Sequence, residues 1–246
     1  MSLFGLFGKK DAGGGSQIVD EHFVPAASES LETALARKDL TSVHHLIRYE
    51  WARAVLRTRG RAGRILDLGS GDGYGAAAIA REFTASQVLA VDYDPLAVKG
   101  AAAKYAAPNL EYREANSMEW SATIGDEPFD VVVSFDVLEH VPHRELVLEG
   151  IARHLADDGV FLFSTPSGAG ANLLTPPWTH HKIEYCAASL YDFLGRYFRE
   201  VVGRDLPGFP CGEVFDVLAE RGVEYLSTLN PAVCSKPIRL ANPYRR

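Results

Sequence analysis

The chain has 246 residues, of which 47% are hydrophobic, enough to build one substantial core. Its formal net charge of −7 argues against a protein that binds mainly by neutralising the phosphates of nucleic acid, so no nucleic-acid partner is expected. The three cysteines are odd in number and widely spaced, which favours neither a disulfide framework nor a zinc site and fits a cytoplasmic protein.

Residues 1–27 are predicted to be a flexible tail, and residues 28–246 are predicted to form the folded domain. The tail begins with MSLFGLFGKKDAGGGS, where apolar residues precede two lysines and a glycine-rich stretch, the wrong order for a secretion signal. No later run approaches the length of a transmembrane span. The apolar residues of the tail could touch a membrane surface or a partner, and a frayed end is the alternative.

Helix and strand patterns alternate after the tail. Two helices are expected first, within SESLETALARKDL and TSVHHLIRYEWARAVLRTRG, the second with Thr41 or Ser42 as its N-cap and Gly60 as its terminator. Helical stretches at 73–83, 94–106 and 143–156 then separate most of five short apolar runs, which are RILDLG, QVLAVDYD, NLEYREA, FDVVVSFD and GVFLFSTP. This alternation predicts an α/β domain with a mostly parallel sheet covered by helices on both faces.

The turn after the first apolar run carries Gly69, Gly71 and Gly73, which let the backbone pass close to a ligand and turn into a helix. The spacing of the last two glycines also satisfies a dinucleotide fingerprint, so the glycines alone do not identify the ligand. Asp67 lies beside the turn and favours a ligand that presents a cation there over a pyrophosphate. S-adenosyl-L-methionine carries an ammonium and a sulfonium and no phosphate. Asp92, at the end of the second run, could accept hydrogen bonds from both ribose hydroxyls.

The segments ILDLGSGDG and VLAVDYD resemble the signature of class I S-adenosylmethionine-dependent methyltransferases. The resemblance implies a Rossmann-like, doubly wound sheet of seven strands and S-adenosyl-L-methionine as the cofactor. NLEYREANSMEW and FDVVVSFDVLEHV are similar to the family's segments that border the adenine and the methyl-transfer channel, with Asn116 where many relatives have Asp. Residues assigned to cofactor binding by this resemblance are Asp67, Gly69, Ser70, Gly71, Gly73, Asp92, Tyr93, Asn116, Ser117, Met118, Phe135 and Asp136.

Two further segments, HLIRYEWA and STPSG…HHKIEY, resemble methyltransferases encoded among bacterial glycan and lipopolysaccharide genes. This resemblance implies that Arg48 and Tyr49 lie over the methionine end of the cofactor and that a sugar or glycan precursor is the small-molecule acceptor. NPAVCSKPI is similar to the last sheet strand of that group. A quinone-type ring, RNA or protein acceptor, or a nicotinamide-dependent oxidoreductase, are the alternatives, and the exact acceptor and the oligomeric state are left open.

Residues 166–186 form a long irregular stretch that is typical of a lid over an acceptor pocket. Within it, His181 is predicted to be the general base; Glu184 either orients its imidazole or forms an ordinary salt bridge. His143 is the reserve base, and Asp136 either helps to place the acceptor or caps the following helix. No spaced set of metal ligands stands out, so metal-independent transfer of a methyl group to an oxygen is expected.

Overall fold

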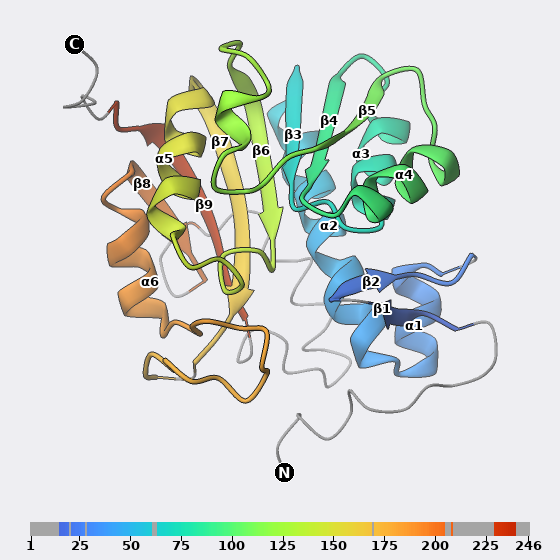
Figure 1. Ribbon diagram of the computed structural model, residues 1–246, viewed down its shortest axis with the longest axis horizontal. Coiled ribbons are helices and arrows are strands. Elements are labelled where there is room, and N and C mark those ends of the chain that lie inside the picture. The colour runs from blue at the N-terminus through green and yellow to red at the C-terminus, as the bar shows by residue number, and fades with distance from the viewer. Residues whose placement is uncertain are drawn as a thin grey trace.

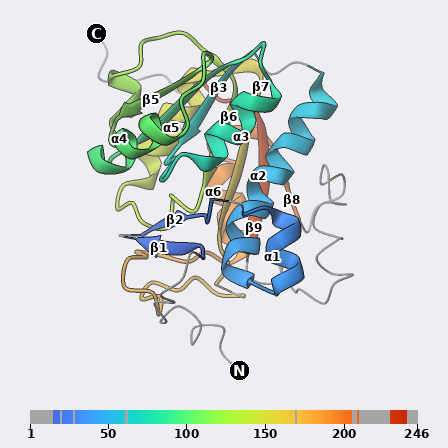
Figure 2. The same ribbon diagram turned by 90° about the vertical axis from the view of Figure 1, so that its right-hand side faces the viewer.

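A computed structural model describes residues 15–19, 21–27, 29–60, 63–168, 170–204, 208 and 229–239. The architecture is an α/β fold built on one large sheet, with a small two-stranded sheet and two helices at one end of it (Figures 1 and 2).

The large sheet has seven strands in the order β5-β4-β3-β6-β7-β9-β8. The first five in chain order pair in parallel, and β9 pairs antiparallel with both β7 and β8. The strands are β3 (Arg64–Leu68), β4 (Gln87–Asp92), β5 (Leu110–Glu114), β6 (Phe129–Phe135), β7 (Leu155–Pro166), β8 (Phe198–Gly203) and β9 (Leu229–Pro237). This topology confirms the predicted Rossmann-like, mostly parallel sheet of seven strands.

Helices follow the strands as the alternating pattern predicts. They are α1 (Leu31–Arg37), α2 (Leu40–Arg59), α3 (Tyr74–Glu82), α4 (Pro95–Lys104), α5 (Arg144–His154) and α6 (Ala187–Leu194), with a short 3₁₀ helix at Trp120–Ala122. Gly60 caps α2 in the left-handed conformation, as predicted. The N-cap of α2 is Asp39 rather than Thr41 or Ser42, because its carboxylate accepts the backbone N–H of Ser42 at 3.2 Å.

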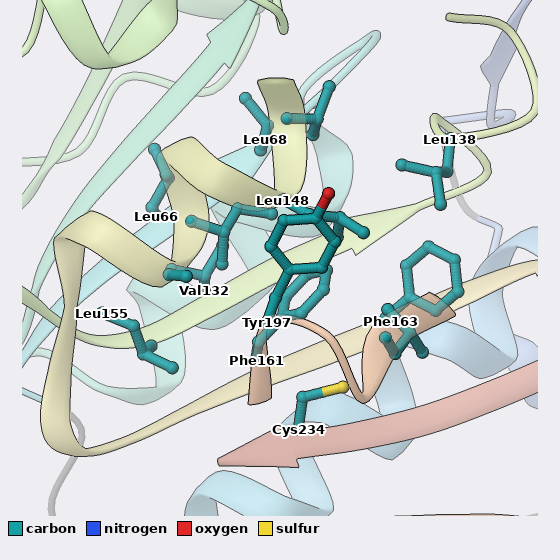
Figure 3. Close-up of a cluster of buried hydrophobic side chains, with 14 of the residues drawn as sticks. Leu66, Leu68, Val132, Leu138, Leu148, Leu155, Phe161, Phe163, Tyr197 and Cys234 are labelled. Carbon is teal, nitrogen blue, oxygen red and sulfur yellow. The ribbon is translucent and has the colours of Figure 1, made fainter. Parts of the chain in front are cut away.

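Two apolar clusters cover the two faces of the sheet. Neighbouring residues of β3 point to opposite faces, so Leu66 packs in the cluster that includes α5 and α6, whereas Ile65 packs with residues of α2 and α3. Figure 3 shows the first cluster, in which Phe161 and Phe163 of β7 lie close to Cys234 of β9. These rigid layers fix the positions of the loops at the strand ends.

The carboxyl ends of β6 and β7 point toward the end of the molecule where the small sheet and α1 lie (Figure 1). That sheet is an antiparallel hairpin of β1 (Gln17–Val19) and β2 (His22–Val24). Residues 1–27 are predicted to be a flexible tail, and this prediction is wrong for the end of the tail, where the hairpin is regular structure. Residues 1–14 lie outside the described residues.

Candidate active site

A cavity of about 560 Å³ lies at the carboxyl ends of the strands. Six segments line it: the β1–β2 hairpin, the α1–α2 junction with α2, the glycine turn after β3 with the start of α3, the end of β6 with the stretch that follows it, the end of β7 with the loop after it, and the start of β9. Ligands of open α/β sheets bind in this position. The cavity therefore brings together the predicted glycine turn and the predicted lid.

The three glycines of the turn all have positive φ angles, but the space around them differs. A Cβ on Gly69 (φ 81°) would lie 2.2 Å from Val137, and one on Gly73 (φ 83°) would lie 2.6 Å from Ala101, so both positions are closed by packing. A Cβ on Gly71 (φ 53°) would face the cavity, with His22 as its nearest neighbour at 3.5 Å. Among the three, Gly71 is the position at which a ligand can approach the backbone.

Asp92 stands at the end of β4 and is only 4% exposed. Its carboxylate accepts the backbone N–H of Gly71 at 2.8 Å and that of Asp94 at 3.1 Å, and His22 Nε2 lies 3.5 Å from Oδ1. Burial raises the pKa of Asp92, but the hydrogen bonds from His22 and from the two backbone groups outweigh it, so the pKa lies below its ordinary value. Asp92 is therefore ionised at neutral pH and rigidly tied to the glycine turn.

Asp67 is completely buried and lies behind Tyr49, which lines the cavity. The Tyr49 hydroxyl donates to the Asp67 carboxylate at 3.0 Å, and burial raises the pKa of Asp67 to about 7. A Cβ on Gly75 would collide with the Tyr49 ring, so the ring is wedged between α2 and the start of α3. Asp67 thus acts on the cavity through Tyr49 rather than by direct contact.

The predicted adenine-binding residues Asn116, Ser117 and Met118 follow β5 and lie outside the cavity lining. The Asn116 side-chain carbonyl accepts the backbone N–H of Met118 at 2.9 Å, and Tyr93, which follows β4, is 60% exposed. Met118 packs against the core, and Ser117 is half-buried. In this structure the Asn116 carbonyl is engaged within its own loop, so its predicted hydrogen bond to the adenine amino group requires that local bond to be shared or broken.

A buried ion pair closes the cavity on the side of α2. Arg48 Nη2 lies 2.6 Å from Asp136 Oδ2, and Arg48 Nε donates to the Ser164 hydroxyl at 3.1 Å. Asp136 has a positive φ of 56°, a strained conformation for a residue with a side chain, and its Oδ1 is buried with no hydrogen-bond partner among the described residues. Burial raises the pKa of Asp136, and the nearby charges of Arg48 and His181 oppose the rise. With this backbone conformation, the Asp136 carboxyl lines the cavity between the predicted cofactor region and the predicted acceptor region.

The loop after β7 carries the predicted base. His181 Nδ1 lies 2.7 Å from Glu184 Oε1; Glu184 is buried, and both residues line the cavity. When Nδ1 carries the proton and donates to Glu184, Nε2 is left with the basic lone pair. The structure therefore supports the orienting role for Glu184. Of the predicted lid over residues 166–186, the residues that line the cavity are Pro166, Ser167, Trp178, His181 and Glu184.

His143 lies elsewhere. It precedes α5, its side chain is 63% exposed, and its ring nitrogen is 3.2 Å from Glu145. It does not line the cavity. The reserve assignment of His143 as a base is therefore not supported by its position.

The residues assigned to the site from the sequence include neither Glu139 and His140 nor Glu21 and His22. Glu139 is completely buried, with Oε2 accepting the Thr165 hydroxyl at 2.9 Å and Oε1 without a hydrogen-bond partner among the described residues, 4.0 Å from His140 Nε2. Burial, reinforced by the charge of Asp136, raises the pKa of Glu139 well above its ordinary value. In the run QIVDEHFV two apolar pairs flank the polar residues DEH, which was the weak signal available for a hairpin carrying Glu21 and His22.

One group within the described part of the chain could hold a metal ion. It consists of Glu139, His140 and His181, whose potential ligand atoms all lie within 4.8 Å of one another. The rings of the two histidines meet edge to face with their centroids 4.8 Å apart. Methyl transfer without a metal ion therefore stays a prediction, and this group of possible metal ligands gives a reason to test it.

A family profile described as a methyltransferase domain matches residues 43–200, well over half of the chain. The chain belongs to this methyltransferase family. The matched residues include α2, the glycine turn, Asp92, Asp136 and the His181–Glu184 pair, but they exclude the β1–β2 hairpin.

Proteins similar to this chain in sequence are also described as methyltransferases. A probable S-adenosylmethionine-dependent methyltransferase of Mycolicibacterium smegmatis is 33% identical over 175 residues, covering 70% of this chain and 63% of that protein. A Mycobacterium tuberculosis protein described in the same way is 39% identical, covering 46% of this chain and 39% of that protein. The chain thus spans less than two thirds of the length of these two relatives. A ubiquinone biosynthesis O-methyltransferase of Paracidovorax citrulli is 31% identical over 73% of each chain.

The fold has solved counterparts. A putative sarcosine dimethylglycine methyltransferase from Galdieria sulphuraria superposes with a TM-score of 0.58 at 18% identity, covering 79% of this chain and 86% of that chain. Together with the sequence relatives, this match confirms the predicted family, its fold and S-adenosyl-L-methionine as the cofactor. In the described residues, no helix is both long and apolar enough to cross a bilayer.

Proposed function

We propose that this methyltransferase transfers the methyl group of S-adenosyl-L-methionine to a hydroxyl oxygen of a sugar or glycan precursor. The observation that carries the proposal is the His181–Glu184 pair, which lines the same cavity as the open backbone of Gly71. A base held beside the cofactor region is what transfer to a hydroxyl oxygen requires.

The residues present fit the cofactor. Gly71 offers bare backbone, Asp92 offers an ionised carboxylate for the ribose hydroxyls, and the buried Ser70 hydroxyl has no partner among the described residues. The methionine end would lie toward Arg48 and Tyr49, which line the cavity from α2. When bound, the cofactor supplies a methyl group that its sulfonium makes electrophilic.

The chain's own residues then have three tasks. The enclosing segments exclude water, the half-buried carboxyl of Asp136 and the buried carboxyl of Glu139 bind and orient the acceptor hydroxyls, and His181 Nε2 takes the proton of the reacting hydroxyl. Glu184 holds the imidazole in the required tautomer and stabilises the imidazolium that forms. Trp178, which also lines the cavity, offers a flat apolar face to a sugar ring.

A quinone-type ring is the second candidate acceptor. It is favoured by the likeness to the Paracidovorax citrulli ubiquinone biosynthesis O-methyltransferase and by the aromatic residues Phe23, Tyr74 and Phe135 in the cavity wall. A phenolic hydroxyl is more acidic than a sugar hydroxyl, so it depends less on a strong general base.

Isotope-labelled S-adenosyl-L-methionine, offered with a panel of sugar nucleotides and of hydroxylated quinone precursors, tests the proposal. Label is expected in an O-methyl group of a sugar product, with its loss in His181→Ala. Label only in quinone products would replace the sugar by the second candidate. Turnover that falls on chelation and returns with Mg²⁺ would assign the role of Glu139, His140 and His181 to a metal site instead.

The proposal also covers the lid, the location of the activity and the class of the acceptor. The loop of residues 166–186 is placed as the lid over the acceptor, and the activity is placed in the cytoplasm, where Cys186 and Cys234 would stay as the free thiols seen here. The acceptor is a small molecule rather than nucleic acid, because the chain is acidic.

A further inference from the structure

The β1–β2 hairpin brings one side chain onto the cofactor region. His22 begins β2, and its ring is only 15% exposed. Nε2 lies 3.5 Å from Asp92 Oδ1, and Nδ1 lies 3.8 Å from Asp94 Oδ2. The hairpin precedes the residues matched by the family profile, so this contact belongs to a part of the chain that the profile does not describe.

His22 meets both features that would receive the ribose. One is the Asp92 carboxylate, and the other is Gly71, where His22 Cδ2 lies 3.5 Å from the position of a Cβ. A Cβ at Gly71 would be in ordinary van der Waals contact with the imidazole, so the ring borders the space over Gly71. A ribose hydroxyl that hydrogen-bonds to Asp92 Oδ1 would compete with His22 Nε2 for the same oxygen.

The tip of the hairpin also reaches the acceptor side of the cavity. The Glu21 carboxylate pairs with His180 Nδ1 of the loop after β7, and its other oxygen lies 3.5 Å from His140 Nδ1. On the other side, Phe23 stacks on His45 of α2 with ring centroids 4.3 Å apart. The hairpin therefore contacts the end of β4, the segments that follow β6 and β7, and α2.

We propose that the β1–β2 hairpin is a gate over the cofactor site, in which the His22 imidazole holds the Asp92 carboxylate until the cofactor displaces it. The proposal rests on the placement of the ribose at Asp92 and Gly71 under the proposed function. It adds that cofactor entry must break the His22–Asp92 contact and move the hairpin, so the apparent affinity equals the intrinsic affinity multiplied by the fraction of molecules in which the gate is open.

The charges around His22 give the gate a direction with pH. Asp92 and Asp94 face the ring from the β4–α4 turn and Glu21 lies beside it on the hairpin, whereas His45, on the element packed against Phe23, is held neutral by burial. The hydrogen bond to Asp92 is the largest influence, and it raises the pKa of His22 against the opposing effect of burial. The contact is fully formed below the ordinary histidine pKa and is lost as pH rises through the raised value.

Calorimetric titration with S-adenosyl-L-homocysteine tests the gate. His22→Ala is expected to bind about two- to tenfold more tightly than the unchanged protein at pH 6, because an ion pair that competes with the ligand is gone. The unchanged protein should gain affinity between pH 6 and pH 8, and the variant should gain much less. Gln17→Ala, at an exposed position of the same hairpin, is the matched control and should behave like the unchanged protein.

Weaker binding by His22→Ala would show that His22 holds the cofactor, and equal binding would show that the contact is irrelevant; either result overturns the gate. If His22→Ala fails to fold, His22→Gln, which keeps a polar side chain without a titratable charge, should lose the pH dependence alone. If Asp92→Ala leaves the affinity unchanged, the ribose placement has failed and the gate fails with it. If Asp92→Ala weakens binding while His22→Ala does nothing, the placement stands and only the gate is wrong.

Discussion

Asp92 holds the glycine turn in place and, under the proposed function, also binds the ribose of the cofactor. Its two oxygens accept the backbone N–H groups of Gly71 and Asp94, which hold the glycine turn against the end of β4. Each carboxylate oxygen has a second lone pair for a ribose hydroxyl, so binding of the cofactor need not break these bonds. The residue is ionised and preorganised before any ligand arrives.

Asp92→Ala is expected to weaken S-adenosyl-L-homocysteine binding by about 1–3 kcal/mol, because charge-assisted hydrogen bonds to the ribose are lost. Asp92→Asn keeps one acceptor oxygen, so its affinity should lie between those of the unchanged protein and Asp92→Ala. Calorimetry measures the affinities, and circular dichroism checks that both variants are folded. A folded Asp92→Ala protein with unchanged affinity would remove this residue from the site.

His181→Ala should lower turnover by about 10²- to 10⁴-fold while leaving S-adenosyl-L-methionine affinity nearly unchanged, since a base acts on the acceptor proton. Glu184→Gln should cost less and shift the pH profile of turnover, because it alters the orientation of the imidazole and the stabilisation of its charge. His143→Ala should keep its turnover, because that exposed ring lies outside the cavity. Loss of activity in His143→Ala with full activity in His181→Ala would reverse the assignment.

The elements show which parts of this arrangement follow from local sequence. The strands from Arg64 to Pro166 and the glycine turn were predictable, because apolar runs separated by helical periods and glycines encode them within short windows. The β1–β2 hairpin and its contact with Asp92 were not predictable. Three-residue strands carry little periodicity, and the contact joins His22 and Asp92, which are 70 residues apart in the chain. Strand β8 was missed for the same reason, since FREVVG alternates weakly.

Gly71→Val should abolish cofactor binding and leave the protein folded. The new side chain would fill the space beside His22, and the left-handed backbone would cost about 1–3 kcal/mol of strain. Titration with S-adenosyl-L-homocysteine and thermal unfolding measure the two effects. Binding retained in a folded Gly71→Val protein would show that the turn is purely structural.

Gly100 offers a contrasting position inside α4. A Cβ there meets nothing within 4 Å, and the backbone is helical. Gly100→Ala is therefore expected to stabilise the protein by about 0.5–1 kcal/mol, the usual gain from replacing an interior helical glycine, without changing cofactor affinity. Chemical denaturation measures the gain; a loss of stability would mean that α4 needs the flexibility of glycine at this point.

At the scale of the whole molecule, the active-site end encloses several ionisable groups with opposite effects on stability. Burial lowers the pKa values of His44 and His45 to about 3, and it raises that of Asp67 to about 7. The histidines favour the folded state above their ordinary pKa, whereas the buried acid favours it at low pH. The total dependence of stability on pH is a sum of these opposing slopes, so a single residue is best isolated by a difference between two proteins.

His45 is the clearest case, because its half-buried ring stacks on Phe23 and bonds to the Thr41 carbonyl at 2.7 Å. Its folded pKa is depressed, so its stabilising effect is present above about pH 6.5 and is lost as pH falls toward 3. Relative to His45→Gln, the unchanged protein should lose up to about 1.4 kcal/mol of unfolding free energy for each pH unit between 6 and 4. Urea denaturation at several pH values measures this difference, with His143→Gln as an exposed control. A difference that stays constant with pH would mean that His45 becomes protonated within the folded protein, and that the hairpin and α2 separate enough to admit water.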